Sequence, residues 1–254
     1  PAKTNLAVAY SANGNSKECI KNFKDILSKN NYKSNLDNKM ESDIRYSLGI
    51  ELLREGKYKE GLKNYECRLS ASDYPLDLKL YKNMPRSLDE IKNKKVLVVA
   101  EQGFGDVLQF VRYLKLLKEY TPEIYLQCNK KLFRILNSIG YIKGFYDFDD
   151  KIENYDFYIP LMSLPYFFKT NLKNIPNFYY IKPEENLVNE WKNKLKEKKG
   201  FKIGLFWQGN VDSSGSSARA IKLNDLEILL DFKNVDFVSL QKGNNCFQRH
   251  PKQE

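Results

Sequence analysis

The chain has 254 residues, of which 42% are hydrophobic and 29% charged, a composition typical of folded globular proteins and unlike that of disordered ones. Lys and Arg (42) outnumber Asp and Glu (32), which gives a net charge of +10. The basic residues are scattered without a dense block, which favours solvated surfaces over nucleic-acid binding. No run approaches the roughly 18 apolar residues that span a bilayer, and no signal pattern opens the chain. We therefore expect a cytoplasmic protein without a membrane span.

The cysteines and the histidine limit the chemistry. Cys19, Cys67, Cys128 and Cys246 stand far apart, and no pair has the spacing of metal ligands. We expect reduced thiols and no bound metal. Because His250 is the only histidine, Ser-His-Asp or Cys-His catalysis is not expected.

Residues 1–70 carry only helical patterns and contain a repeat at an offset of 42 residues. The repeated positions are Leu6, Ala7, Tyr10, Cys19 and Phe23, which correspond to Leu48, Gly49, Leu52, Gly61 and Tyr65. The small members of this set would let paired helices approach closely. A tetratricopeptide repeat has a period of about 34 residues, and the polar linker at residues 30–39 accounts for the difference. We interpret the region as two tetratricopeptide-like repeats, which either pack on the next domain or bind a protein partner.

The stretch at residues 96–117 organises the rest of the chain. Residues 96–100 are a continuous apolar run, which predicts a strand buried on both faces. Gly103 and Gly105 favour a tight turn, and Asp106 stands where a helix N-cap is expected. Apolar residues at helical spacing follow. Together they predict the opening of a βαβ unit, whose loop is where α/β proteins bind ligands.

Alternating patterns continue beyond this unit. A short helix is expected at residues 87–91 before it, strands at residues 123–127, 144–148, 156–161 and 177–181 after it, and helices at residues 130–139 and 163–168. The alternation predicts a mainly parallel sheet.

A second α/β unit is expected after a helix that follows Pro183 and a charged run that ends at Gly200. Its predicted strand, helix and strand lie at residues 202–207, 223–230 and 235–240. The expected domains are helical repeats over 1–70, a Rossmann-like domain over 71–199, and the beginning of a second Rossmann-like domain over 200–254.

The loop at residues 102–108 does not match a dinucleotide site. The third glycine of the fingerprint is replaced by Leu108, and Asp106 puts a carboxylate where a pyrophosphate needs positive potential. We therefore assign no cofactor. Asp106 has two compatible roles, a helix cap or a base that accepts a proton from an attacking hydroxyl. Glu101 and Gln102 are interpreted as turn residues more readily than as ligand contacts.

Residues 209–223 form a second candidate loop. Its glycines and serines leave backbone N–H groups free, and Arg219 and Lys222 could meet a diphosphate. The alternative interpretation is a flexible surface loop with two solvated cations.

Several strings resemble one family in the same order. AEQGFGDVLQFVRYL resembles the AEQG-[LF]-GD-x-[IL]-QF-x-RYL segment of bacterial tetratricopeptide proteins with glycosyltransferase-like C-terminal regions. GLKNYECRL, IGLFWQGN, an R-x-I-x-L string at residues 219–223 and FVSLQKG match the same family. That family is related to the heptosyltransferases of glycosyltransferase family nine, which implies a two-Rossmann architecture.

The resemblance also implies residue roles. In heptosyltransferases a Gly-Asp pair heads the first helix and its Asp is thought to be the general base for the acceptor hydroxyl; Gly105 and Asp106 match this pair. The second domain holds most of the nucleotide sugar. The substrate-binding residues implied in this chain are Gln102, Gly103, Gly105, Gly209, Asn210, Arg219 and Lys222.

The resemblance implies a metal-independent, inverting glycosyltransferase that uses a nucleotide-sugar donor. The family continues beyond its SLQKG string through further strands and a D-[TS]-x-x-AHLA-type segment that this sequence does not contain, so we expect the fragment as given to be inactive. The alternative is a non-catalytic scaffold in which tetratricopeptide helices dock on a degenerate Rossmann-like domain.

Overall fold

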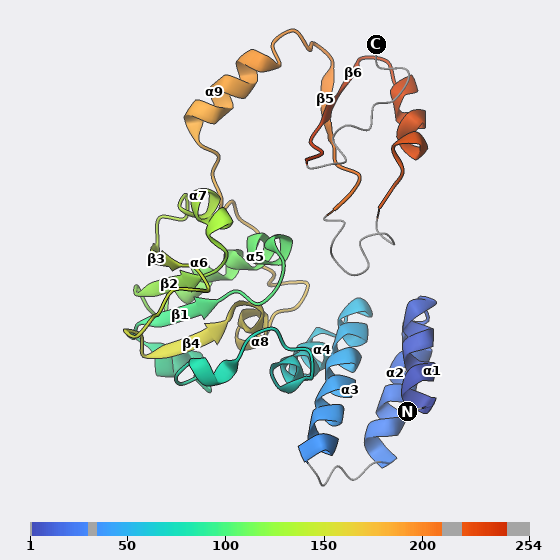
Figure 1. Cartoon of the computed structure of the whole chain (residues 1–254), viewed down its shortest axis with the longest axis vertical. Coiled ribbons are helices and arrows are strands. Elements are labelled where there is room, and N and C mark those ends of the chain that lie inside the picture. Colours follow the sequence, from blue (N-terminus) through green and yellow to red (C-terminus); the bar gives the residue numbers. More distant parts are fainter. Residues whose placement is uncertain (1, 30–34, 210–219, 243–254) are drawn as a thin grey trace. The chain divides into compact units, whose positions relative to one another are not determined.

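The computed structural model describes residues 2–29, 35–209 and 220–242 (Figure 1). The chain divides into two compact units, Pro1–Lys182 and Pro183–Glu254, and each is described by itself. Within the described residues, no helix has the length and apolar character needed to cross a membrane.

The first unit begins with helices, as the sequence predicts. They are α1 (Ala2–Ala12), α2 (Ser16–Lys29), α3 (Asn35–Arg54) and α4 (Tyr58–Tyr65), followed by the 3-10 helix η1 (Glu66–Ser70). The helix α2 packs against both α1 and α3, and α3 packs against α4 (Figure 1). Gly14 and Gly56 have left-handed backbones (φ 72° and 70°) two residues after α1 and α3 end, which is where a glycine commonly terminates a helix.

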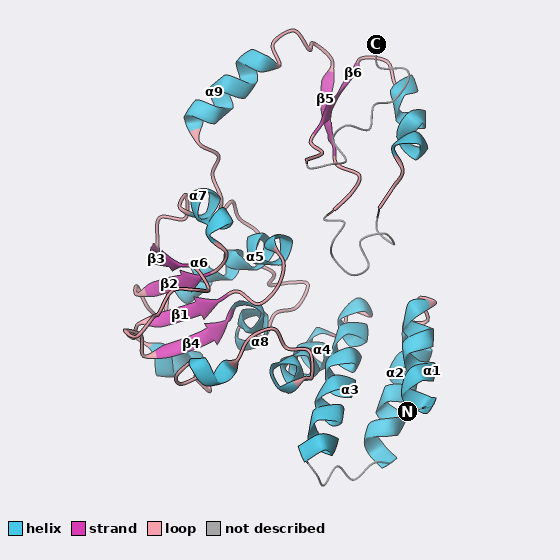
Figure 2. Ribbon diagram, viewed as in Figure 1, coloured by secondary structure: helices cyan, strands magenta, loops and turns pink. Residues whose placement is uncertain are grey.

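A four-stranded sheet follows, built from β1 (Val96–Val99), β2 (Ile124–Gln127), β3 (Ile142–Tyr146) and β4 (Phe157–Pro160). Its order is β3-β2-β1-β4, and every neighbouring pair is parallel (Figure 2). The expected mainly parallel sheet is confirmed. All four residues of β1 are fully buried, because β1 lies between two strands and apolar side chains cover both of its faces.

Short helices flank the sheet. They are η2 (Leu78–Leu80), η3 (Leu88–Ile91), α5 (Phe104–Phe110), η4 (Val111–Tyr113), α6 (Leu114–Leu117), η5 (Lys130–Leu132), α7 (Phe133–Leu136), η6 (Leu161–Ser163) and α8 (Leu164–Phe167). The amphipathic segment after β1 is therefore three consecutive pieces rather than one helix. Its stripe of Val107, Val111, Leu114 and Leu117 is nonetheless buried in the main core.

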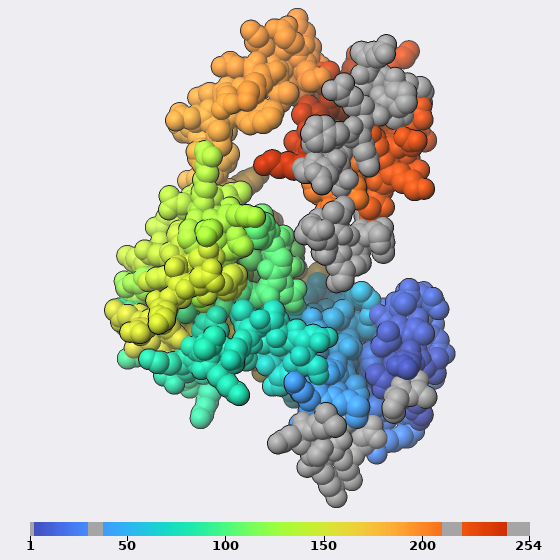
Figure 3. All heavy atoms as spheres, in the orientation of Figure 1, coloured from blue at the N-terminus to red at the C-terminus, as the bar shows by residue number. Residues whose placement is uncertain are grey.

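The connecting segment between the helices and the sheet lies against both, as the space-filling view shows in teal (Figure 3). The backbone N–H and hydroxyl of Ser72 donate to the two carboxylate oxygens of Asp43 on α3, at 2.7 and 2.8 Å. Further along, Tyr81 packs against the cluster of Leu97 and Tyr158 on β1 and β4.

The strand predicted at residues 177–181 is wrong, because this segment has no regular secondary structure. Its aromatic side chains attach it to the helical layer instead. The Lys115 Nζ lies 4.1 Å from the ring centroid of Phe178, and the Tyr180 hydroxyl donates to the Leu108 carbonyl at 2.8 Å. Of these three consecutive aromatic residues, Phe178 and Tyr180 are half-buried, whereas Tyr179 is 99% exposed, so the segment packs against the fold without strand pairing.

The second unit contains α9 (Glu185–Lys194), β5 (Phe201–Leu205), the 3-10 helix η8 (Leu223–Asp231) and β6 (Val235–Ser239). The two strands pair in parallel. The helix expected at residues 223–230 is present as a 3-10 helix. A parallel pair with a helical crossover is the unit from which α/β sheets are built.

Candidate functional site

The candidate site lies where β1 and β4 end at the carboxyl edge of the four-stranded sheet. From β1 the chain proceeds to β2 and β3 on one side, whereas β4 lies on the other side of β1. In an open parallel sheet, this change of direction leaves a crevice at the carboxyl ends of the strands where ligands bind. The loop of residues 100–103 after β1 and the turn η6 after β4 therefore form the floor of the site.

A buried ion pair closes the bottom of this crevice. Arg68, on η1, directs Nε and Nη2 at the two carboxylate oxygens of Glu101, both at 3.0 Å. The side chains of the two residues are 2% and 1% exposed. A bidentate pair of this kind fixes both side chains because the guanidinium fork matches the carboxylate.

Further hydrogen bonds complete this network. Arg68 Nη2 also donates to Ser163 Oγ at 2.8 Å. Glu101 accepts from the Tyr74 hydroxyl at 2.7 Å and from the backbone N–H of Met162 at 2.9 Å. The network consequently ties η1, the loop after β1 and the turn after β4 into one assembly.

The electrostatics of the network follow from burial and charge. Burial opposes the charge of Arg68, but the carboxylates of Glu101 and Glu66 outweigh it and raise the pKa of Arg68. Burial raises the pKa of Glu66, although Arg68 opposes the shift. The pKa of Tyr74 is raised by burial and then by the adjacent Glu101. Arg68 therefore stays charged and Tyr74 stays a neutral donor across the physiological range.

The sequence reasoning missed this network. It treated Glu101 as a turn residue, whereas Glu101 is buried and accepts hydrogen bonds on both oxygens. Arg68 and Ser163 received no role at all. Arg68 stands in a segment of mixed charged, polar and apolar residues (GLKNYECRL), so the sequence does not mark it as buried, and nothing in the sequence identifies its partner 33 residues away.

A cavity of about 350 Å³ adjoins the network, between α3, η1, the connecting segment and the loop after β1. Gln102 lines it, and its amide nitrogen donates to the Tyr65 hydroxyl at 3.4 Å. Asp43 and Asp73 also line it. The cavity therefore presents carboxylate, hydroxyl and amide groups, which are the hydrogen-bonding partners of a polyhydroxylated molecule.

Asp106 is not the N-cap of α5, which corrects the expectation from its position. The cap is Gly103 (φ −64°, ψ 167°), and Asp106 is the third residue of the helix. The helix begins earlier than expected because Gly103 is the last residue with an extended backbone and helical geometry begins at Phe104. The Asp106 carboxylate bends back toward the cap, since Oδ2 would lie 3.5 Å from a Cβ placed on Gly103. Asp106 is half-buried, and within the described part of the chain its carboxylate makes no hydrogen bond or ion pair.

The glycines beside Asp106 are not required by a strained turn. The chain turns from β1 to α5 within residues 100–103, but neither Gly103 nor Gly105 has a positive φ, so this turn does not need the backbone freedom of glycine. A Cβ on Gly105 would meet nothing within 4 Å. Because these two exposed glycines have no side chains, the surface next to Asp106 is not covered by side-chain atoms from them.

The other residues that the sequence predicts to bind substrate belong to the second unit. Gly209 is exposed with open space around its Cα. The backbone N–H of Ile221 donates to the Trp207 carbonyl at 3.0 Å, which holds the exposed Lys222 close to the loop after β5. Asn210 and Arg219 lie outside the described residues.

The sequence reasoning also missed Gln241, which orders the loop after β5. Its side-chain oxygen accepts from the backbone N–H groups of Trp207 (3.3 Å) and Gln208 (3.1 Å), and its nitrogen donates to the Gln208 carbonyl at 2.9 Å. Gln241 is 8% exposed. The glutamine of the SLQKG string thus fixes the carboxyl end of the neighbouring strand.

The structure therefore places Gln102, Gly103, Gly105 and Asp106 on one segment of the first unit. In the second unit, Gly209 lies in the loop after β5, and Lys222 follows Ile221, whose backbone hydrogen-bonds to that loop. Over the described ranges, no group of three or more His, Cys, Asp or Glu side chains could hold a metal ion. The fold defines a mixed α/β protein with a parallel sheet flanked by helices. In comparisons with known proteins, no family model, curated protein or solved structure matches this chain.

Proposed function

We propose that the chain is part of an inverting glycosyltransferase of the heptosyltransferase-like kind, in which Asp106 is the general base for an acceptor hydroxyl. The observation that carries the proposal is the Asp106 carboxylate, which has no hydrogen-bond or ion-pair partner among the described residues and lies at the carboxyl edge of the central strand. The bare glycine surface beside it leaves room for an acceptor. The polar cavity at Gln102 supplies groups suited to a sugar.

The proposed reaction is a single displacement. The acceptor hydroxyl gives its proton to Asp106 as its oxygen forms a bond to the anomeric carbon of the donor sugar. The bond from that carbon to the diphosphate breaks, and the nucleoside diphosphate leaves with the bonding electron pair. Attack opposite the leaving group inverts the anomeric configuration.

The proposed donor side is the second unit. Its parallel strands and helical crossover support the beginning of a second Rossmann-like domain. In this proposal Gly209, Asn210, Arg219 and Lys222 contact the diphosphate of the nucleotide sugar. The role of Gln241 is to hold the backbone of the loop after β5 in place for that contact.

The helices at the start of the chain are proposed to be two tetratricopeptide-like repeats. Gly14 and Gly56, which end the first helix of each pair, stand at the same offset of 42 residues as the repeated apolar positions. Gly49 and Gly61 both lie at the contact between α3 and α4, which supports the role expected for small residues in a repeat.

The test is sugar transfer by the protein translated from the complete reading frame, assayed with a panel of nucleotide sugars. Asp106→Asn should lower the transfer rate by about 10²- to 10⁴-fold, while calorimetric binding of the donor stays unchanged. Asp89→Asn is the matched control, because Asp89 is an exposed carboxylate paired with Lys92 at 2.8 Å. Undiminished transfer by the Asp106 variant would show that the base is another group.

A scaffold role is the second candidate, favoured by apolar side chains that α1 exposes. Leu6 and Val8 are 46% and 53% exposed, whereas Phe23 is 2% exposed and belongs to the core rather than to a binding surface. A scaffold would lose a specific bound protein on Leu6→Asp/Val8→Asp substitution and would show no transfer with any donor. Retained partner binding by that variant would exclude α1 as the docking surface.

A further inference from the structure

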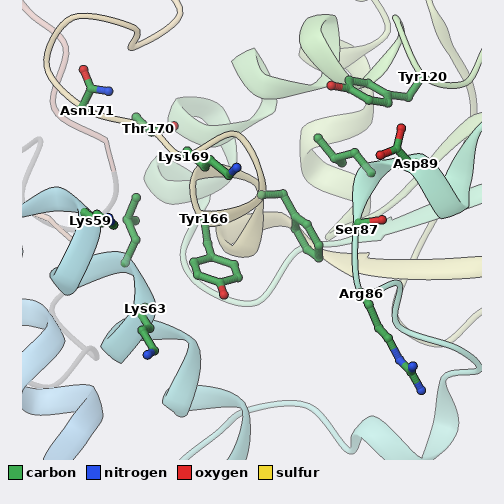
Figure 4. Close-up of a pocket in the computed structure, with 13 residues that line it drawn as sticks. Lys59, Lys63, Arg86, Ser87, Asp89, Tyr120, Tyr166, Lys169, Thr170 and Asn171 are labelled. Atoms are coloured by element: carbon green, nitrogen blue, oxygen red, sulfur yellow. The ribbon is translucent and has the colours of Figure 1, made fainter.

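A second cavity of the first unit has no role in the proposed transfer. It has a volume of about 640 Å³ and lies between α4, the segment around η3, the turn after α6, and α8 (Figure 4). Both η3 and the turn at Tyr120 precede strands, β1 and β2 respectively. The cavity is therefore on the amino-end side of the sheet, away from Asp106.

Four basic side chains surround this cavity. Lys59 and Lys63 come from one side, on successive turns of α4; Arg86 comes from the opposite side; and Lys169, which follows α8, lies between them (Figure 4). All four are exposed.

None of these four cations has an ion-pair partner among the residues that the structure describes. The nearby acidic side chains interact with other groups. Asp89, the carboxylate that lines the cavity, pairs with Lys92 at 2.8 Å. Glu60 pairs with Lys24 at 2.6 Å, and Glu90 accepts from the backbone N–H of Arg86 at 2.9 Å. The cavity therefore carries an excess of positive charge that its own walls leave uncompensated.

The floor of the cavity is apolar and aromatic. Tyr166 lies at its centre and is 42% exposed (Figure 4). Leu62 and Leu88 are buried beside it, and Phe167 is half-buried. An aromatic ring exposed inside a concave, charged surface is a stacking platform for a planar group.

We propose that this cavity binds a small organic phosphate with a planar ring, of the nucleoside diphosphate class. The phosphates would contact the lysine ammonium groups, which bind phosphate as point charges. The ring would lie on Tyr166. The volume is within the range of about 300–1,000 Å³ that is usual for small-molecule sites. This site is separate from the proposed donor loop after β5 and does not depend on the glycosyltransferase proposal.

The test uses isothermal titration calorimetry of the complete chain with three probes: ADP, pyrophosphate and adenosine. ADP should bind most tightly, because only ADP supplies both the ring and the phosphates. Its affinity should fall as salt is raised. Lys63→Glu and Lys169→Glu should each weaken ADP binding at least several-fold. Tyr166→Ala should weaken the binding of ADP but leave that of pyrophosphate unchanged.

Two controls keep this result distinct from the proposed transferase. Lys82→Glu makes the same change of charge at an exposed lysine outside the cavity and should leave the ADP affinity unchanged. Lys222→Ala, at the proposed donor loop, should also leave binding at this cavity unchanged. Failure of ADP to bind, or binding that is weakened by Lys222→Ala but not by Lys63→Glu, would overturn the proposal. Neither result bears on Asp106.

Discussion

Gly49 on α3 faces the backbone of Tyr65 on α4 so closely that a Cβ at Gly49 would lie 2.6 Å from the Tyr65 backbone nitrogen. The neighbouring Asn64 carbonyl carbon would be 2.9 Å away. These obstacles are backbone atoms, which cannot rotate aside as a flexible side chain can. The separation of α3 and α4 is therefore set by the absence of a side chain at one position.

Gly49→Ala should lower the free energy of unfolding by about 1–3 kcal/mol, the usual effect of overpacking. Gly105→Ala is the matched control: Gly105 is also helical, but a Cβ there meets nothing within 4 Å, so its effect should stay within about 1 kcal/mol and favour the helix. Urea unfolding followed by circular dichroism measures both. Equal effects of the two substitutions would mean that α3 and α4 can separate freely.

The Arg68–Glu101 ion pair predicts that substitutions of its two residues have strongly non-additive effects on the free energy of unfolding. Arg68→Met should destabilise the protein by about 3–5 kcal/mol, because it leaves Glu101 buried without its counter-charge. The double substitution Arg68→Met/Glu101→Gln should cost less than Arg68→Met alone, since it leaves no buried carboxylate without a counter-charge. The glutamine oxygen can accept from the Met162 N–H, and its amide nitrogen can donate to the Tyr74 hydroxyl, which then acts as the acceptor. A double-mutant cycle from urea unfolding gives the coupling. Additive effects would show that the two charges do not depend on each other.

Glu66 predicts a pH dependence of stability. Burial raises the pKa of Glu66 above its ordinary value of 4.5, despite the opposing charge of Arg68. A carboxyl with a raised folded-state pKa stabilises the fold below its unfolded pKa, and this contribution is lost as the pH rises through the folded value. Relative to Glu66→Gln, wild type should therefore lose stability as the pH rises above about 4.5. Urea unfolding of both proteins between pH 4 and 7 checks the sign, and a constant difference would contradict it.

The buried thiols predict selective labelling. Cys19 and Cys128 are fully buried. Burial, reinforced by the Glu51 carboxylate, raises the pKa of Cys19 to about 11, and burial with the Asp147 charge raises that of Cys128 to about 12. Because the thiolate is the reactive form, iodoacetamide at pH 8 should modify neither until urea unfolds the chain. Peptide mapping by mass spectrometry provides the measurement, and native labelling of Cys128 at the unfolded rate would show that the sheet core opens readily.

The sequence predicted the parts of this fold that depend on local pattern. The buried strand at residues 96–99, the parallel sheet and the initial helices follow from apolar periodicity, because each pattern reports the faces that its own segment buries. The incorrect prediction of a strand at residues 177–181 also came from a local pattern. A run of aromatic residues indicates that some of its side chains pack against the fold, but it does not distinguish pairing to a strand from the attachment of Tyr180 to the helical layer.

The candidate site was predicted less completely, since its geometry depends on contacts across the chain. The position of Asp106 within α5 differs from the expected cap by three residues, because the extended backbone at Gly103 decides where the helix begins. Glu101 looked like a turn residue because its partners Arg68, Tyr74 and Met162 come from three separate segments. Local propensity carries no information on such partners.

The hydrogen bonds of Gln241 lead to the prediction that its side-chain amide orders the loop after β5. Gln241→Leu removes an acceptor for two backbone N–H groups and a donor to the Gln208 carbonyl, so it should destabilise this loop by about 1–3 kcal/mol. The reporter is Trp207, which is 6% exposed, in a Trp191→Phe background that removes the half-exposed second tryptophan. Gln241→Leu should shift the Trp207 emission to the red and increase its quenching by acrylamide.

The matched control for this experiment is Gln208→Leu. The Gln208 contacts with Gln241 are made by its backbone, so the substitution removes an amide of the same size but leaves the hydrogen bonds in place. Its Trp207 emission should remain that of the Trp191→Phe parent. Matching spectra for Gln241→Leu and the parent would show that strand pairing of β5 and β6 alone keeps Trp207 buried, and that the glutamine of the SLQKG string has another purpose.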